Sequence, residues 1–204
     1  MNKQKRNILY IGILLLVLEV IKQFLLTFVL YEGKYCWKYF PFQLCSIPIY
    51  ICLIGGLSKS NDTFETCLDY LSTYGLLGGI CAFLDTTGFK YDLMIITIHS
   101  YVWHIILIVL GIYAMFIKKT YGFKKPTLIY LFCCLVAALL NYIVSEYQYI
   151  DMFYINTKYK MNQIVFVDIA KTLGNKQTIV FYMFMTIVGA YLLNLFSKLI
   201  RKIN

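Results

Sequence analysis

Charged residues are scarce in this chain of 204 residues, where Asp, Glu, Lys and Arg together make up 14%. A soluble domain contains about 25% charged and about 45–50% apolar residues, whereas 60% of this sequence is hydrophobic. The chain has too little polar surface for a water-soluble protein. The same composition excludes a disordered tail, a collagen-like fibre and a disulfide-stapled secreted module. The sequence therefore predicts an integral membrane protein.

Acidic residues are the scarcest charged class, with 10 Asp and Glu against 19 Lys and Arg and a net charge of +9. On a soluble protein this excess would raise the question of a nucleic-acid partner. Here the basic residues lie between long apolar runs. We therefore expect an anionic membrane surface as the partner, and no nucleic acid.

Long apolar runs occupy most of the chain. A helix needs about 20 mainly apolar residues to cross the hydrocarbon core, and its backbone groups must pair within the helix. Six segments reach or approach this length, which predicts an all-α, polytopic membrane helix bundle that forms one domain over residues 1–204. The expected spans are residues 8–30, 42–57, 64–84, 93–117, 127–145 and 178–200.

The basic residues of the short connections predict the orientation of the bundle. Loops that remain in the cytoplasm carry an excess of Lys and Arg, and the connection at 118–125, KKTYGFKK, carries most of this signal. We therefore expect a multi-pass protein of the cell membrane with both termini in the cytoplasm.

The connection at 146–177 is long for so small a protein, and long loops are often functional or partly structured. Within it, residues 163–173 place apolar side chains around only Asp168 and Lys171. This pattern predicts either an interfacial helix on the outer leaflet or a buried connecting helix, and it leaves both open.

Ionisable groups inside spans are costly, so each is a hypothesis for a functional site. Glu19 and Lys22 are three residues apart in the first span and are expected to neutralise each other. Glu65 and Asp69 lie near a cytoplasmic end and are expected to be solvated.

The 7 cysteines include no CxxC pair, and no metal-ligand spacing is present, so neither a metal site nor another cofactor is predicted. A disulfide between Cys36 and Cys45 remains open. Most cysteines of a membrane helix are small packing residues.

Cys45 differs from the other cysteines in its position. Pro41 is a natural opening residue for a helix, which would place Cys45 in the first turn, where unpaired N–H groups favour a thiolate. Pro48 would then remove the hydrogen bond to the Leu44 carbonyl and loosen the backbone beside the thiol.

The sequence contains 2 histidines, His99 and His104, which are its bases of near-neutral pKa. Five helical residues turn the chain by about 140°, so the two rings do not face one point well. One of them is expected to serve Cys45 as a base, as in a Cys–His pair.

These residues resemble a known family. The run FPFQLCSIPIYICLIGGL at 40–57 resembles the Leu-Pro-Leu-His-Leu-Cys motif of the YwaF-like bacterial integral membrane proteins, although Gln43 stands where that family favours histidine. The run HIILIVLGIYAMF at 104–116 is similar to the family's histidine-bearing span. Weaker landmarks are Asn141-Tyr142 and residues 164–184.

The eukaryotic relatives of that family are transmembrane acyltransferases that remodel ether phospholipids. The resemblance implies Cys45 as the acyl-accepting nucleophile and His104 as its base. His99 is the second choice, because it is closer to the expected depth of Cys45.

The leading hypothesis is a membrane acyltransferase or lipid-remodelling enzyme that acts on membrane phospholipids. Gln43, Ser46 and Asn141 are expected to bind the substrate, with Gln43 and Ser46 beside the oxyanion. Three alternatives stay open: a small-solute-binding subunit of a transporter with an ATPase partner, a non-enzymatic scaffold or sensor, and an intramembrane cysteine peptidase.

Overall fold

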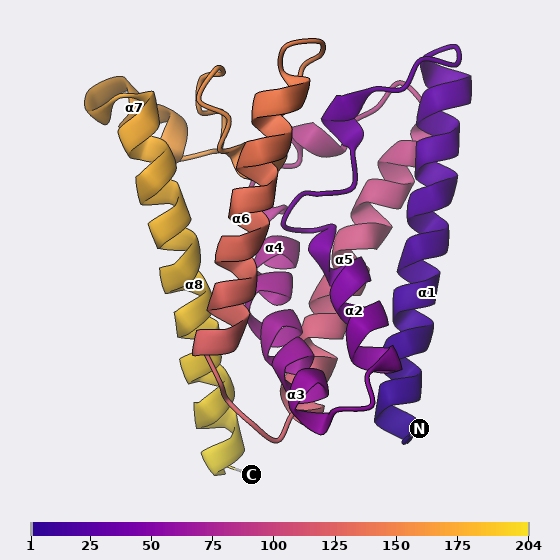
Figure 1. The fold of residues 1–204 in the computed structure, drawn as a ribbon, viewed down its shortest axis with the longest axis vertical. Helices are drawn as coiled ribbons and strands as arrows, with labels where there is room; N and C mark the ends of the chain where they lie inside the picture. Colours follow the sequence, from indigo (N-terminus) through magenta and orange to yellow (C-terminus); the bar gives the residue numbers. More distant parts are fainter. Residues whose placement is uncertain (1, 204) are drawn as a thin grey trace.

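Four long helices run along the height of the bundle, and both termini lie at the same end of it (Figure 1). The computed structural model describes residues 2–203, with side chains as far as Ile200, and no strand occurs in this part of the chain. The four helices are long and apolar enough to cross a membrane, which confirms an all-helical membrane bundle. They are α1 (Lys3–Phe24) with its π-helical continuation η1 (Leu25–Leu30), α5 (Met94–Ile117), α6 (Lys124–Val144) and α8 (Asn175–Ile203).

The other two expected spans take different forms. Where a span was expected at 42–57, α2 (Ile47–Leu57) has only 11 residues and is about 16 Å long at about 1.5 Å per residue. The span expected at 64–84 consists of consecutive helical pieces. Neither meets the length criterion alone, so six separate membrane crossings are not confirmed. The pieces of the latter span are α3 (Asn61–Tyr70), the π-helix η3 (Leu71–Gly75) and α4 (Leu76–Cys81).

The start of α2 corrects the expectation that Pro41 opens this helix. The helix begins at Ile47 after the N-cap Ser46 and carries its proline, Pro48, in the first turn, where no intrahelical N–H bond is needed. Cys45 therefore lies just before the helix, not in its first turn, and Pro48 removes no helical hydrogen bond. Figure 1 shows α2 beginning part-way down the bundle, reached from the end opposite the termini by a non-helical segment.

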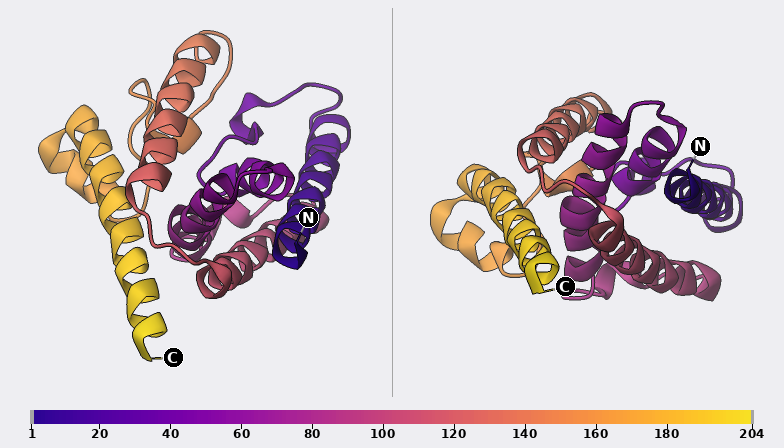
Figure 2. Two further views of the ribbon diagram at one scale, coloured as in Figure 1. Left: turned by 60° about the horizontal axis from the view of Figure 1, so that its bottom comes forward. Right: turned by 90° about the horizontal axis from the view of Figure 1, so that it is seen from below.

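Close approach of α1 and α2 depends on two glycines. A Cβ on Gly12 would lie 2.8 Å from the Cβ of Cys52, and one on Gly56 would lie 2.6 Å from the Cβ of Leu9. Small residues at such contacts allow helices to pack closely in a membrane. The interrupted helix α3–η3–α4 runs through the middle of the bundle, with α1 and α5 to one side and α6 and α8 to the other (Figure 2).

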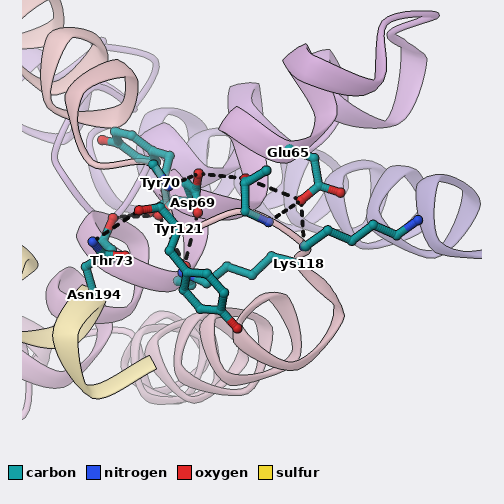
Figure 3. Close-up of polar contacts among 11 residues, drawn as sticks. Glu65, Asp69, Tyr70, Thr73, Lys118, Tyr121 and Asn194 are labelled. Atoms are coloured by element: carbon teal, nitrogen blue, oxygen red, sulfur yellow. Dashed lines mark hydrogen bonds and ion pairs between the residues drawn. The ribbon is translucent and has the colours of Figure 1, made fainter. Parts of the chain in front are cut away.

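A buried ion pair joins α3 to the connection after α5 (Figure 3). This connection lies near the end of the bundle that carries the termini (Figure 1). Asp69 is 3% exposed and lies 3.4 Å from the Lys118 ammonium, which also donates to the Ser72 hydroxyl at 2.9 Å. The second Asp69 oxygen accepts from the Thr120 hydroxyl at 3.1 Å and from the Gly122 N–H at 2.9 Å. The carboxylate thus binds Lys118, Thr120 and Gly122 and holds the connection in place.

The expectation that Glu65 and Asp69 are solvated is wrong for Asp69, and Glu65 is also only partly exposed. One Glu65 oxygen accepts from the N–H groups of Lys119 at 2.7 Å and Thr120 at 3.2 Å. The physical reason is that the turn after α5 has N–H groups without helical partners, and the two carboxylates satisfy them.

We predict that Asp69→Ala lowers the stability of the folded protein strongly. The change leaves the Lys118 side chain, which is 0% exposed, without its counter-ion. Breaking a buried pair costs about 3–5 kcal/mol, or roughly 10 °C in Tm for a chain of this size. Thermal unfolding of the purified protein in detergent measures the change.

The matched control is Asp62→Ala, which breaks a pair with Lys125 whose side chains are 74% and 57% exposed. Exposed pairs contribute about 1 kcal/mol or less. Equal losses in the two variants would contradict the structural importance of the buried pair.

Candidate functional site

A cavity of about 440 Å³ lies at the end of the bundle opposite the termini. A volume of this size is within the range of small-molecule sites. Its walls come from segments far apart in the sequence. They are the end of α1, residues 38–46, residues 78–91, the first half of α5, the connection after α6 and Tyr182 of α8.

Five of the six residues singled out in the sequence line this one cavity. Asn141 is the sixth and is not part of the lining. The five are Gln43, Cys45, Ser46, His99 and His104.

Cys45 is held from α5 through its backbone. The indole N–H of Trp103 donates to the Cys45 carbonyl at 3.2 Å. Trp103 lies one helical turn after His99 and directly before His104, so the residue that anchors the cysteine segment belongs to the same stretch of α5 as both imidazoles. The structure gives Cys36 and Cys45 as free thiols, so no disulfide joins them.

His104 has a defined tautomer. Its Nδ1 lies 2.7 Å from the Ser100 carbonyl oxygen. A carbonyl oxygen can only accept, so Nδ1 carries the proton and Nε2 keeps a free lone pair. Phe89 stacks on the ring with centroids 4.5 Å apart, and Phe83 meets it edge-on. These contacts fix the ring in a form that can accept a proton.

His99 is placed differently. Its ring stacks on Trp103 with centroids 5.5 Å apart and lies beside the Leu18 backbone of α1. Both histidines line the cavity despite their separation around α5, together with Ser100 and Trp103 of the same helix.

Two side-chain amides hold the connection after α6. Gln43 donates to the Asp151 carbonyl at 2.8 Å and accepts from the Phe153 N–H at 2.7 Å. Asn141 donates to the Met152 carbonyl at 3.0 Å and accepts from the Met152 N–H at 2.7 Å. Both residues were expected to bind substrate, but their side-chain amides form hydrogen bonds with backbone groups instead. They hold one wall of the cavity in place.

The segment held by these amides is strained and buried. Phe153 and Tyr154 both have a φ of 57°, in the left-handed region that is uncommon for residues other than glycine. Phe153 is 2% exposed and packs near Phe42 and Tyr130, while Tyr154 lines the cavity. Such strain persists only where the surroundings enforce it.

The predicted helix at 163–173 is shorter than expected. The helix α7 (Phe166–Leu173) contains no buried residue, so the alternative of a buried connecting helix is wrong. Phe166 contacts the rings of Phe181 and Tyr182 on α8, and Leu173 is 51% exposed.

The family model for the TMEM164 family matches residues 1–196. The chain belongs to the TMEM164 family. No curated protein and no solved structure matches the chain. The family is one of transmembrane proteins, and together with the four long apolar helices this makes the chain a multi-pass membrane protein.

In this TMEM164-family chain, Glu19 and Lys22 form the ion pair expected from the sequence. Their closest atoms are 2.7 Å apart, and Lys22 also lines the cavity. Within the described residues, no group of three or more His, Cys, Asp or Glu side chains comes together in a way that suits a metal ion.

Sequence reasoning missed the contributions of Trp103 and Lys22 to this cavity. A signal for Trp103 was available in its position between the two histidines, one turn after His99. Lys22 stood out in the sequence as a charged residue inside a span, but nothing there indicated that it borders the same cavity as Cys45.

The carboxyl group of Asp151 makes the stability of the TMEM164-family protein depend on pH. Asp151 is 7% exposed, and burial raises the pKa of its carboxyl from 3.8 to about 6. The folded state therefore binds this proton more tightly than the unfolded state. The resulting stabilisation is present below about pH 4 and is lost as the pH rises through about 6, at a cost on the order of 3 kcal/mol.

We predict that Asp151→Asn is more stable than the natural protein at pH 7, by about 2–3 kcal/mol, and similar to it at pH 4. The amide oxygen can still accept from the Asn156 N–H, which lies 2.9 Å from the Asp151 carboxyl. Thermal unfolding at pH 4, 5, 6 and 7 tests this, with the exposed Asp168→Asn as a control. A stability difference that does not change between pH 4 and pH 7 would contradict it.

Proposed function

We propose that this protein is a membrane-embedded acyltransferase, or a related lipid-remodelling enzyme, that uses a Cys–His pair on phospholipid acyl groups. The observation that carries the proposal is that Cys45, His99 and His104 line one cavity, while Trp103 joins their helix to the Cys45 carbonyl. The resemblance to the YwaF-like proteins, and through them to ether-phospholipid acyltransferases, supports the same pair. A thiol and a neutral imidazole are the groups that nucleophilic acyl transfer requires.

The chemistry divides into two transfers. His104 Nε2 accepts the Cys45 proton while the sulfur bonds to the ester carbonyl carbon of a phospholipid and the carbonyl electron pair moves to oxygen. Collapse breaks the bond to the lysophospholipid oxygen, which takes the proton from the imidazolium. The hydroxyl of a second lysolipid then attacks the Cys45 thioester by the reverse sequence and regenerates the thiol.

The choice of His104 as base follows from its tautomer, since the Ser100 carbonyl holds the proton on Nδ1 and leaves Nε2 free. His99 is the second candidate, because it stacks on Trp103 beside the Cys45 segment. Ser46 is the remaining proposed substrate-binding residue, since it lines the cavity and its hydroxyl interacts with the Cys45 side chain.

The proposed setting is the cell membrane, with both termini in the cytoplasm and the cavity on the outer side. The basic connection 118–125 supports this orientation. We propose that α2 and the α3–η3–α4 run complete two further crossings. In this orientation α7, with its exposed apolar side chains, lies at the surface of the outer leaflet.

A small-solute-binding subunit of a transporter is the second candidate. Its support is the aromatic lining of the cavity, which includes Tyr39, Phe89, Tyr91 and Tyr154. A solute retained on purification, or an ATPase that purifies with the chain, would favour this function. A scaffold or sensor would need neither a ligand nor a reactive thiol.

We predict that Cys45→Ala and Cys45→Ser abolish acyl transfer, because alanine has no nucleophile and a serine hydroxyl is far less ionised than a thiol. The assay uses purified protein in bilayer discs with phospholipid labelled in its acyl chain and an unlabelled lysolipid acceptor. Mass spectrometry of the trapped protein should find the acyl group on Cys45.

The control is Cys36→Ala, which removes a free thiol that is not part of the cavity lining. It should leave acyl transfer unchanged. Full activity of the Cys45 variants, or an acyl group on the cavity residue Cys81, would refute the proposed nucleophile. A peptide bound to Cys45 would instead indicate a cysteine peptidase.

A further inference from the structure

A polar triad on α1 borders the cavity. Glu19 is 3% exposed, and its oxygens lie 2.7 and 2.8 Å from the Lys22 ammonium. Gln23 donates to Glu19 at 2.7 Å and to the Tyr39 carbonyl at 2.6 Å. The triad therefore ties α1 to the segment that leads to Cys45. An ion pair buried in a span is costly and is poor evidence for stability alone, so it invites a functional explanation.

Lys22 retains hydrogen-bonding capacity on the cavity side. An ammonium has three N–H donors, and one carboxylate occupies two of them. Within residues 2–203, no acceptor for Lys22 other than Glu19 is present. Its side chain is 15% exposed and lines the cavity, so one N–H remains for a bound molecule.

Trp103 places Lys22 near the reacting thiol. The Lys22 ammonium lies 6.0 Å from the centre of the Trp103 ring, and the indole N–H of the same ring donates to the Cys45 carbonyl. One aromatic side chain thus separates the cation from the backbone of the nucleophile. The positive charge of Lys22 also acts electrostatically on the Cys45 thiol.

Of the two donors first expected beside the oxyanion, Gln43 and Ser46, the Gln43 amide already binds protein backbone. Its partners are the backbone groups of Asp151 and Phe153. Asn141, which was expected to bind substrate, lies outside the cavity with its amide on Met152. Nucleophilic attack on an ester concentrates negative charge on the carbonyl oxygen, and that charge requires a fixed donor.

We propose that Lys22 is a further catalytic residue, whose free N–H donates to the oxyanion formed when Cys45 adds to an acyl carbonyl. This inference rests on the proposed acyl transfer. Lys22 keeps all its protons throughout: the thiol proton moves to His104 and then to the leaving lysolipid oxygen, and the oxyanion electron pair returns to the carbonyl as the ester bond breaks. Glu19 is a positioning residue that holds the ammonium against Trp103.

The test compares two reactions of Cys45 in the purified full chain. Acylation by p-nitrophenyl decanoate passes through an oxyanion, whereas alkylation by iodoacetamide does not. For Lys22→Met we expect acylation slower by about 100-fold or more, and alkylation changed by no more than a few-fold. Lys22→Arg, which keeps a cationic donor, should restore a large part of the acylation rate.

Because Lys22→Met leaves Glu19 buried without its partner, the double variant Glu19→Gln with Lys22→Met removes both charges and should show the same selective loss. Lys34→Met is the matched control, because Lys34 is exposed and lies in the connection that follows η1. It should leave both rates unchanged. Mass spectrometry assigns each product to Cys45.

The outcomes separate the two proposals. A natural protein that forms no acyl product on Cys45 would refute the proposed function and this role with it. Normal acylation of Lys22→Met and of the double variant would refute the oxyanion role of Lys22, as would an equal loss of acylation and alkylation. Either result would leave the acyltransferase proposal standing.

Discussion

Backbone polar groups cannot remain unpaired away from water, and this requirement governs how residues 40–46 enter the bundle. The segment is not helical, so some of its carbonyls pair with nearby backbone N–H groups and others with side chains. Pro41 accepts from the Tyr50 hydroxyl at 2.9 Å, and Cys45 accepts from the Trp103 indole at 3.2 Å. Irregular backbone at membrane depth is tolerated where it is buried in protein or lines a cavity. Here the non-helical segment that precedes α2 also forms one wall of the cavity.

The connection after α6 is held by the same kind of compensation. Gln43 and Asn141 pair in alternation with the backbone of residues 151–153, as a neighbouring strand would. This pairing keeps Phe153 and Tyr154 at positive φ, beside the cavity. The wall formed by this connection therefore depends on the non-helical segment that carries Cys45, so a change in one alters the geometry of the other.

Hydropathy predicted the four long spans because their length and apolar content are properties of each segment alone. It did not predict where α2 begins, since the sequence offers both Pro41 and Pro48 and only tertiary contacts decide between them. Asp69 was misjudged for a similar reason: its partners are N–H groups of a distant turn. The order of motifs placed His104 with Cys45 and the expected depth favoured His99, but the sequence did not predict that both rings line one cavity with the thiol. The connecting Trp103 was not predicted either, because its contact joins elements remote in sequence.

The two buried ion pairs show how the same chemistry can serve different ends. Lys118 has the Asp69 carboxylate, the Ser72 hydroxyl and, 4.7 Å away, the Tyr121 ring, and its side chain is 0% exposed, so it stabilises a turn. Lys22 has one carboxylate and the face of an aromatic ring, and it borders a cavity. A cation that is enclosed on every side can only hold structure. A cation held on one side and open on the other can meet a charge that forms during a reaction without reorganising, which is the condition for electrostatic catalysis.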